Sequence, residues 1–546
     1  MLRRRDMLAI AASAAVVLAG VSAGTASADP SWRGHGGRAP TVAGFKNVVV
    51  IYEENHSFDN LYGSWGPVNG EPVTGLSTAR QVNTTQVATD GDAYGCLLQN
   101  DANLTAASPV PTTCVDKAHR VPASGFANGP FTIDDSIGPD DETCAAEGTS
   151  APATGVLKGS PEAVAGGCTR DLVHRFYQEQ YQLNGGLQNR YVTGSDAVGL
   201  TMGVYRTTDL PIYRYLHGRG APNYVIADHF FQAAFGGSFL NHQYLVAARA
   251  PIDTSAGSGG AHAGLHSMLD ANGFPTNYPL YPATGTVKDG RLTQACGQST
   301  TVAGFACGDY AVNTIQPASP PTAGGDQLPL IDDAQYPNIG DRLSAGNINW
   351  TWYSGGWNDA AAGHPGPLFQ YHHQPLNYFK NYAPGRPGRD HLKDETDFLA
   401  AAKAGRLPTV SFVKPYGGEN EHPGYASEPD GSDHLVDLIT TITTGPQARD
   451  TLIVVTYDEF GGQWDHVSPP GQGTATPGPH DQFGPGTRIP ALLISKGFHS
   501  SGVDHTSYDT TSILATLERA LNLPALDTRD AQVADLTAAI RTGTRH

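Results

Sequence analysis

Two continuous runs of β-branched and apolar residues constrain the fold of this chain more than any other feature. Residues 46–52 read KNVVVIY and residues 451–457 read TLIVVTY, without alternation of apolar and polar positions. This pattern is typical of strands in a parallel sheet, which are buried on both faces because helices cover each face. Residues 409–413 and 489–495 are two further runs of this kind.

Segments with helical patterns lie between these runs, at residues 209–216, 394–404, 433–442 and 510–521. Strands that alternate with helices predict an α/β fold with a mostly parallel, doubly wound sheet. In such sheets, ligands bind beyond the carboxyl ends of the strands. The residues that directly follow each strand are therefore the first candidates for a functional site.

The length of the chain, 546 residues, exceeds what one hydrophobic core usually organises, which is about 250–300 residues. The 65 glycines and 39 prolines indicate many turns and long ordered loops. We therefore expect a single catalytic domain over residues 46–525, enlarged by loop insertions at about 69–168 and 250–341. Residues 29–45 are expected to be a linker and residues 526–546 a C-terminal tail.

The first 28 residues have the pattern of a cleaved signal peptide. Three arginines at residues 3–5 precede an apolar run, and Ala26-Ser27-Ala28 offers the small residues that a signal peptidase requires. The arginines favour the twin-arginine export route, with an ordinary secretory leader as the alternative. No later stretch approaches the roughly 20 apolar residues of a transmembrane helix. We expect an exported protein, secreted, cell-surface or periplasmic, without stable membrane insertion.

The six cysteines agree with export, because an even number of cysteines in an exported chain indicates disulfides. None has the CxxC spacing of a metal site. Six cysteines allow fifteen pairings, so the sequence leaves the connectivity open. The simplest arrangement pairs sequence neighbours and pins the insertions: Cys96 with Cys114, Cys144 with Cys168, and Cys296 with Cys307.

The charge balance excludes one class of partner. The chain has 34 basic and 52 acidic residues and a formal net charge of −18. Nucleic-acid binding rests on clustered Lys and Arg, so a nucleic-acid partner is not expected. The oligomeric state is not indicated by the sequence.

Polar residues with useful chemistry follow three of the expected strands, and two of these strand ends carry candidate metal ligands. Glu54 and Asn55 come after the first run, and Asp458 and Glu459 come after the run that ends at Tyr457. These four side chains offer only oxygen ligands, which suit Mg²⁺, Ca²⁺ or Mn²⁺. The sequence therefore predicts a site for one divalent metal ion. Strands that simply reach the surface would also end in polar residues, which is the structural alternative.

Three other polar residues are ambiguous. Because successive side chains alternate between the two faces of a strand, we expect Glu53 to point to the side opposite Glu54. Asp465 and His466, which follow the second strand end more distantly, fit either a supporting role beside the metal or an ordinary loop.

A nucleophile candidate lies at Ser238, which follows Gly236-Gly237 and opens a helix-like segment. Glycines let the backbone approach a ligand closely, and the start of a helix attracts anions. A serine that only caps the helix is the plain alternative. A nearby metal ion favours the catalytic interpretation, because a serine alkoxide needs a base or a cation near neutral pH.

Histidines are the groups best suited to hold a phosphate or to protonate a leaving oxygen, and they become cationic below about pH 6.5. Lys414 stands at a strand end and is a candidate for an anion contact. The histidine candidates are His174, His372, His373 and His422.

Several motifs resemble those of the bacterial phosphoesterase family that contains exported acid phosphatases and phosphatidylcholine-type phospholipases C. Residues 47–63, NVVVIYEENHSFDNLYG, resemble its opening signature, and residues 456–467, TYDEFGGQWDHV, are similar to its second metal-site signature. The segments around Ser238, His372-His373 and residues 420–424 resemble its internal motifs, in the same order.

The resemblance implies a fold similar to that of alkaline phosphatases and sulfatases, a three-layer sandwich around a mostly parallel sheet. It implies that Ser238 attacks phosphorus and also touches the metal ion. The other metal ligands that it implies are Glu54, Asn55, Asp458 and Glu459. The residues that it places around the phosphoryl group are Asn241, His174, His372, His373 and His422.

Within that family, Tyr52-Glu53-Glu54-Asn55-His56 and Ser238 resemble the acid phosphatase branch, since the phospholipase branch more typically has Gln-Glu-Asn-Arg and a threonine nucleophile. We therefore predict an exported, metal-dependent acid phosphatase that acts on small phosphate esters through a phosphoserine, with a proton supplied by His174 or His422 and an acidic optimum. A phospholipase C or other phosphodiesterase is the alternative within the family. A non-catalytic exported binding protein, with aromatic loops such as residues 350–353 holding a ligand, is the alternative of another class.

Overall fold

The computed structural model describes residues 41–545, except residues 100–110, 147–148, 150, 152–154, 257–307, 323–327 and 474–475. The expected signal peptide, Cys296, Cys307 and much of the second expected insertion lie outside the described residues. Within the described ranges, no helix is long and apolar enough to span a membrane.

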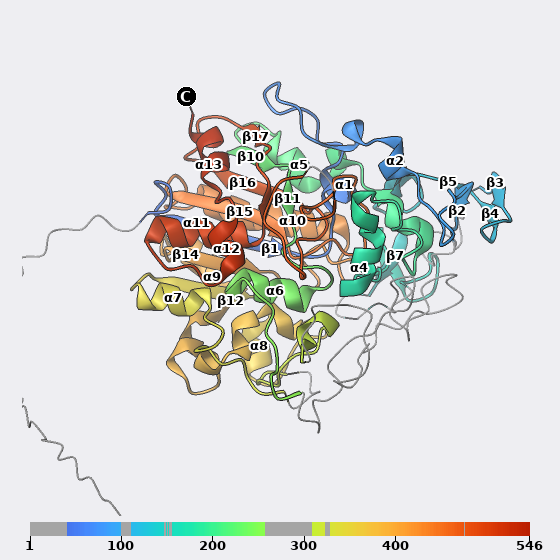
Figure 1. The fold of residues 1–546 in the computed structure, drawn as a ribbon. Helices are drawn as coiled ribbons and strands as arrows, with labels where there is room; N and C mark the ends of the chain where they lie inside the picture. Colours follow the sequence, from blue (N-terminus) through green and yellow to red (C-terminus); the bar gives the residue numbers. More distant parts are fainter. Residues whose placement is uncertain are drawn as a thin grey trace, which may run out of the picture. The chain divides into compact units, whose positions relative to one another are not determined.

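An eight-stranded sheet forms the centre of the fold (Figure 1), with the strand order β13-β12-β14-β1-β15-β16-β10-β17. β16 is antiparallel to both of its neighbours, and the other pairs are parallel. The predicted α/β fold with a mostly parallel sheet is therefore confirmed. The strands are β1 (Asn47–Glu53), β10 (Asn223–Ala227), β12 (Trp350–Ser354), β13 (Leu392–Asp394), β14 (Val410–Lys414), β15 (Thr451–Tyr457), β16 (Ala491–Ser495) and β17 (Gly502–Asp504).

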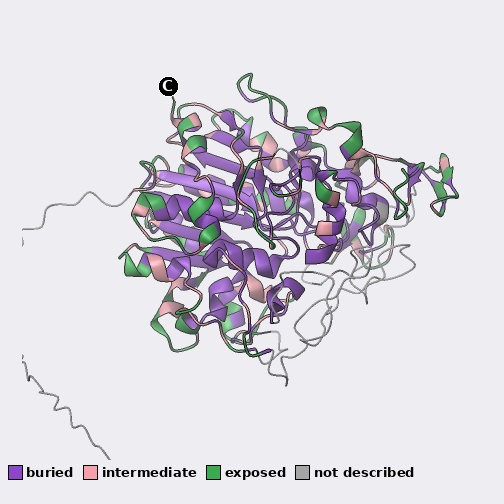
Figure 2. Cartoon of the chain, viewed as in Figure 1, coloured by how far each residue is buried: buried purple, intermediate pink, exposed green. Residues whose placement is uncertain are grey.

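The four apolar runs of the sequence are β1, β14, β15 and β16, which are adjacent in the sheet. Val48 of β1 lies opposite Val410 on one side and Leu452 on the other. Every residue of these four strands is buried, as Figure 2 shows for the centre of the sheet. Burial on both faces explains why the runs are continuously apolar.

One interpretation of the sequence was wrong. The aromatic segment at residues 350–353, which we considered as a ligand-holding loop, is the buried strand β12. Trp350 and Trp352 are both 0% exposed, and the Trp352 ring stacks on Phe412 of the neighbouring strand. These rings are therefore part of the core.

The expected helices are α5 (Pro211–Leu216), α9 (Glu395–Lys403), α10 (Glu428–Thr444) and α11 (Thr511–Leu521). α10 begins five residues earlier than expected, because Ser427 caps it by accepting a hydrogen bond from the Asp430 N–H. A further helix, α6 (Ser238–Ala247), confirms the helical segment expected after Gly237.

The helices form two groups. α10 contacts α5 and α9, whereas α6 contacts α7 (Ile339–Ala345) and α11, which contacts α12 (Thr528–Gln532). α9 and α7, one from each group, both contact β12, as expected for a sheet between two helical layers. The expected C-terminal tail contains α12 and α13 (Thr537–Thr544), and α13 packs on β10 and β17, so this segment is part of the folded domain.

The remaining elements are short and lie mainly in the insertions. The helices are α1 (Phe58–Tyr62), α2 (Gln81–Thr84), α4 (Phe176–Leu183) and α8 (Trp357–Ala361). The strands are β2 (Cys96–Leu97), β3 (Cys114–Asp116), β4 (Val121–Ser124), β5 (Phe126–Ala127), β6 (Phe131–Thr132), β7 (Glu142–Ala145), β8 (Ala163–Ala165), β9 (Gly203–Val204), β11 (Phe230–Phe231) and β18 (Tyr508–Asp509).

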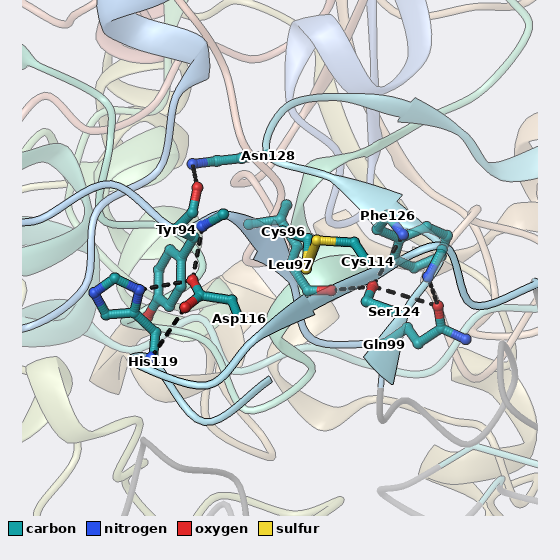
Figure 3. The surroundings of a disulfide bond; sticks show 12 residues. Tyr94, Cys96, Leu97, Gln99, Cys114, Asp116, His119, Ser124, Phe126 and Asn128 are labelled. Atoms are coloured by element: carbon teal, nitrogen blue, oxygen red, sulfur yellow. Dashed lines mark hydrogen bonds and ion pairs between the residues drawn. A yellow bond between two sulfur atoms is a disulfide. The ribbon is translucent and has the colours of Figure 1, made fainter. Parts of the chain in front are cut away.

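Disulfides hold the first insertion. The Cys96–Cys114 and Cys144–Cys168 pairings expected from the sequence are confirmed. Figure 3 shows the first, which joins β2 to β3. Beside it, the Asp116 carboxylate accepts a hydrogen bond from the Gly95 N–H at 2.7 Å and pairs with His119 Nδ1 at 2.7 Å. The third expected pairing lies outside the described residues.

A buried charge network holds together segments that are far apart in the sequence. The Arg488 guanidinium pairs with the carboxylates of Asp59 and Asp465, at 3.0 Å each, and donates to the main-chain oxygens of Thr74 and Asp228. His466 contacts Asp59 at 2.5 Å. Asp465 and His466, which the sequence left between two interpretations, are thus members of this network.

We expect Arg488→Met to lower the free energy of unfolding by roughly 3–5 kcal/mol, because the change leaves two buried carboxylates without their cation. Urea unfolding followed by tryptophan fluorescence measures the loss. Arg206→Met is the matched control, since Arg206 forms exposed ion pairs with Asp135 and Asp209, and its change should be much smaller. Equal losses in the two variants would contradict this account of the network.

Candidate active site

Four oxygen-donor side chains meet at the carboxyl ends of β1 and β15. Glu54 and Asn55 follow β1, and Asp458 and Glu459 follow β15. The two strands are parallel neighbours, and the Asp458 N–H donates to the Glu53 carbonyl at 3.1 Å. All four side chains are 0% exposed. The structure therefore brings together the residues that the sequence predicted as metal ligands.

The local backbone fixes this cluster. Asn55 has a positive φ of 63°, and its N–H donates to Asp458 Oδ1 at 3.1 Å. The loop after β15 passes so close that a Cβ on Gly461 would lie 2.1 Å from the Asn55 carbonyl oxygen. Only glycine is compatible with this approach, which explains Gly461 in the motif.

The cluster fits a hard cation. The buried Oδ1 of Asn55 and Oδ2 of Asp458 have no hydrogen-bond partner. Ser238 Oγ lies 3.4 Å from Glu54 Oε2 and 3.5 Å from Glu459 Oε1. Glu54, His242 and Asp458 also form a group whose ligand atoms lie within 4.8 Å of one another. Oxygen donors dominate this set, as in sites for Mg²⁺, Ca²⁺ or Mn²⁺.

The carboxylates of the cluster disfavour one another's ionisation. Burial and the charge of Glu54 raise the pKa of Asp458 to about 8, and burial and the charge of Asp458 raise the pKa of Glu459. Burial also opposes ionisation of Glu54, but Lys414 and His373 outweigh it and hold the pKa of Glu54 well below its usual range. A cation in the cluster would relieve this repulsion.

Ser238 is the first residue of α6 and faces the cluster. The first N–H groups of a helix have no acceptor within the helix and attract anions. The preceding loop turns at Gly236, with φ +81°, and a Cβ there would lie 2.4 Å from the Phe176 nitrogen. The nucleophile candidate thus sits on a rigid turn beside the predicted metal ligands.

Asn241, one turn further along α6, holds this loop. Its Oδ1 accepts from the Ala234 N–H at 2.9 Å, and its amide donates to the Gly236 carbonyl at 3.0 Å. The side chain is 0% exposed. The structure therefore places both ends of the Asn241 amide against the turn before Ser238.

The predicted histidines surround the same cluster. His373 Nε2 lies 2.9 Å from Glu54 Oε1, and His174 Nε2 lies 3.3 Å from Glu459 Oε1. His422 Nε2 lies 3.0 Å from the Asn55 amide nitrogen. The His372 ring is perpendicular to that of His373, with centroids 4.7 Å apart.

A pocket of about 220 Å³ opens above Ser238. Arg175 is a member of its lining that sequence reasoning missed, and its Nη1 donates to Thr314 Oγ1 at 2.6 Å. The lining residues are Asp171, His174, Arg175, Ser238, Phe239, Thr314, Gln316, Gln370, His372, His422 and Tyr425. Four of the predicted residues therefore face one space of phosphate-ester size.

Burial changes the expected charge of two histidines. It lowers the pKa of His373 to about 4 and also lowers the pKa of His372. The expectation that these two rings become cationic below about pH 6.5 is therefore wrong. Burial therefore opposes protonation of both rings.

Lys414 lies behind the cluster. Its side chain is 0% exposed, its ammonium group forms an ion pair with Glu54 Oε1, and it donates to the Glu53 carbonyl at 3.0 Å. Lys414 does not line the pocket above Ser238. The lysine thus contacts a predicted metal ligand directly.

His242 is a second member of the site that sequence reasoning did not single out. It is fully buried, its Nδ1 bonds to the Ser238 carbonyl at 2.7 Å, and its Nε2 lies 3.9 Å from Glu54 Oε1. The ring stacks on His373, with an interplanar angle of 7°. Its position four residues after Ser238 on a helix was the available signal.

Comparison with known proteins identifies the family. The model of the phosphoesterase family matches residues 45–524, which include every part of the site described above. The chain belongs to the phosphoesterase family.

Bacterial and plant proteins are among the relatives found by sequence comparison. Phospholipase C B of Mycobacterium tuberculosis is 24% identical over 410 residues, which cover 69% of this chain and 64% of that protein. Phospholipase C A of the same organism is 22% identical over 91% of this chain and 78% of the relative. Non-specific phospholipase C3 of Arabidopsis thaliana is 30% identical over 32% of this chain and 36% of its own length.

Solved structures show weaker likeness. The lipoteichoic acid synthase LtaP of Listeria monocytogenes aligns with a TM-score of 0.28 and 8% identity, over 57% of this phosphoesterase and 68% of that chain. The PsFucS1 sulfatase of Pseudoalteromonas sp. aligns with a TM-score of 0.16 and 19% identity, over 26% of this chain and 32% of the sulfatase. The fold assignment therefore rests on the sheet topology of the chain itself.

Proposed function

We propose that this phosphoesterase hydrolyses phosphate monoesters through a phosphoserine formed on Ser238. The observation that carries the proposal is the position of Ser238 Oγ, at the start of α6, between the carboxylates of Glu54 and Glu459 and below a small pocket. A nucleophile, oxygen ligands and imidazoles within one pocket are the parts that phosphoryl transfer requires.

The residues that would hold one divalent ion are Glu54, Asn55, Asp458, Glu459 and Ser238. When bound, such an ion lowers the pKa of a neighbouring hydroxyl group and neutralises charge on the phosphoryl oxygens. Lys414 positions Glu54 for this task rather than contacting substrate, because its ammonium group faces that carboxylate.

The reaction proceeds in two transfers. Ser238 loses its proton to solvent and its Oγ attacks phosphorus, the bond to the alcohol oxygen breaks, and protonated His174 or His422 gives that oxygen its proton. Water then attacks the phosphoserine, the same histidine takes a proton from that water, and phosphate and the deprotonated Ser238 are released. The helix N–H groups, His372 and Arg175 hold the phosphoryl oxygens, while Asn241 and His373 keep the turn and Glu54 in place. The acidic optimum expected from the sequence remains a prediction.

A second function fits the same centre. The relatives named above are phospholipases C, and a phosphodiester would meet the same nucleophile and ligands. The pocket volume of about 220 Å³ and the resemblance to the acid phosphatase branch favour the monoester.

The two functions are separated by a substrate panel. We expect the purified protein, supplied in turn with Mg²⁺, Ca²⁺ and Mn²⁺, to hydrolyse p-nitrophenyl phosphate at least about tenfold faster, by kcat/KM, than p-nitrophenyl phosphorylcholine. A tenfold ratio corresponds to about 1.4 kcal/mol of differential binding in the transition state. The reverse preference would establish the phosphodiesterase instead, and hydrolysis of neither ester would contradict both.

We also propose that the protein acts outside the cytoplasm. Two observations support this placement. They are the signal-peptide pattern of residues 1–28 and the presence of the Cys96–Cys114 and Cys144–Cys168 disulfides. Its partner is a small phosphate ester rather than nucleic acid.

A further inference from the structure

A second pocket lies at the carboxyl ends of β12, β13 and β14 and has a volume of about 500 Å³. It shares no lining residue with the pocket above Ser238. The lining residues are Gly355, Gly356, Asn358, Asp359, Gly366, Asp394, Glu395, Thr396, Tyr416 and Glu419.

The walls of this pocket are built around Tyr416. A Cβ on Gly355 would lie 2.4 Å from the Tyr416 nitrogen, and one on Gly366 would lie 2.5 Å from the Tyr416 hydroxyl oxygen. That hydroxyl accepts a hydrogen bond from the Leu368 N–H at 2.9 Å. The phenol ring is therefore fixed, and glycine at these two positions allows the chain to pass close to Tyr416.

The lining carries charge of one sign. Asp359, Asp394, Glu395 and Glu419 line the pocket, and its lining includes no Lys, Arg or His among the described residues. Asp394 is committed to the structure, since its oxygens accept from the N–H groups of Thr396 and Asn358. Asp359 and Glu419 are exposed at the rim.

Glu395 is the member that points to a ligand. It is only 6% exposed, and its Oε1 contacts His434 Nε2 at 2.8 Å. Its other oxygen, Oε2, is buried without a hydrogen-bond partner. A buried carboxylate oxygen without a donor is costly, so a donor that binds in the pocket would be strongly favoured.

We propose that this pocket binds a small organic cation through a primary ammonium group. The ammonium group donates to Glu395 Oε2, and the carboxylates of Asp359 and Glu419 attract the rest of a positively charged molecule. A charge-assisted hydrogen bond to a buried carboxylate is among the stronger polar contacts in proteins. The volume is that of a molecular ligand rather than of a bare metal ion, which needs only a cage of oxygens.

Isothermal titration calorimetry of the full-length protein with 1,5-diaminopentane tests this site. We expect saturable binding that weakens about tenfold or more in Glu395→Gln, the loss expected for one charge-assisted hydrogen bond. Asp359→Asn should weaken binding less. Because Asp359 is exposed, this variant should fold normally and tests the site even if Glu395→Gln does not fold. Asp90→Asn, an exposed acid outside this lining, should leave it unchanged.

Three outcomes would overturn the proposal. They are the absence of binding at millimolar diamine, equal binding by wild type and by folded Glu395→Gln, and binding of CaCl₂ without binding of the diamine. Ser238→Ala protein serves equally well in this titration, because the two pockets share no lining residue. A failure here therefore leaves the proposed phosphatase activity unaffected.

Discussion

Ser238→Ala is expected to lower kcat for a phosphate monoester by at least about 10³-fold, because the variant has no hydroxyl group to attack phosphorus. Ser238 makes no side-chain cap of α6, and alanine is the best helix former, so the fold and the thermal midpoint should stay close to those of wild type. Steady-state hydrolysis of p-nitrophenyl phosphate and circular dichroism measure the two properties.

Ser238→Thr is the matched control. It keeps a hydroxyl group at the start of α6, and threonine is the nucleophile that the resemblance implies for the phospholipase branch of the family. This variant should retain clearly more activity than Ser238→Ala. Undiminished activity in Ser238→Ala would contradict the assignment of the nucleophile.

Asp458→Asn is expected to have the second-largest effect. The Oδ2 of Asp458 is buried without a hydrogen-bond partner at the centre of the oxygen cluster, so the substitution removes an anionic ligand. We expect metal content after dialysis to fall well below that of wild type and kcat/KM to fall about 10²-fold or more, beyond the range measured for groups that only support ligands. Inductively coupled plasma mass spectrometry and the monoester assay measure these changes.

Dialysis of the wild type against a chelator should reproduce the loss of activity, and added divalent metal should restore it. Asp135→Asn changes the same functional group at an exposed position, where the side chain is 68% accessible, and should leave both metal content and activity intact. If Asp458→Asn kept its metal and its activity, the cluster would not be the metal site.

The sequence predicted the centre of the sheet and the neighbourhood of the site for the same reason. Strands covered on both faces require unbroken apolar runs, which made β1, β14, β15 and β16 recognisable. Since parallel strands end at one edge, the polar residues after β1 and β15 had to meet there. That is where Glu54 and Asp458 lie.

The rest could not be predicted from local pattern. β12 is recognisable only once Trp352 is known to stack on Phe412 of β14. The burial of Lys414 and the lowered pKa of His373 depend on what other segments cover them. His242 joins the site because α6 points its ring at Glu54, and Arg175 because the loop before α4 reaches the pocket. These are consequences of tertiary packing.

The covalent intermediate tests the central claim most directly. Enzyme in steady turnover of a phosphate monoester is quenched in acid and digested, and its peptides are analysed by mass spectrometry. The account predicts one phosphoryl group on the peptide that contains Ser238, which is absent from enzyme quenched without substrate and from Ser238→Ala. A phosphoryl group on another residue during turnover would contradict it.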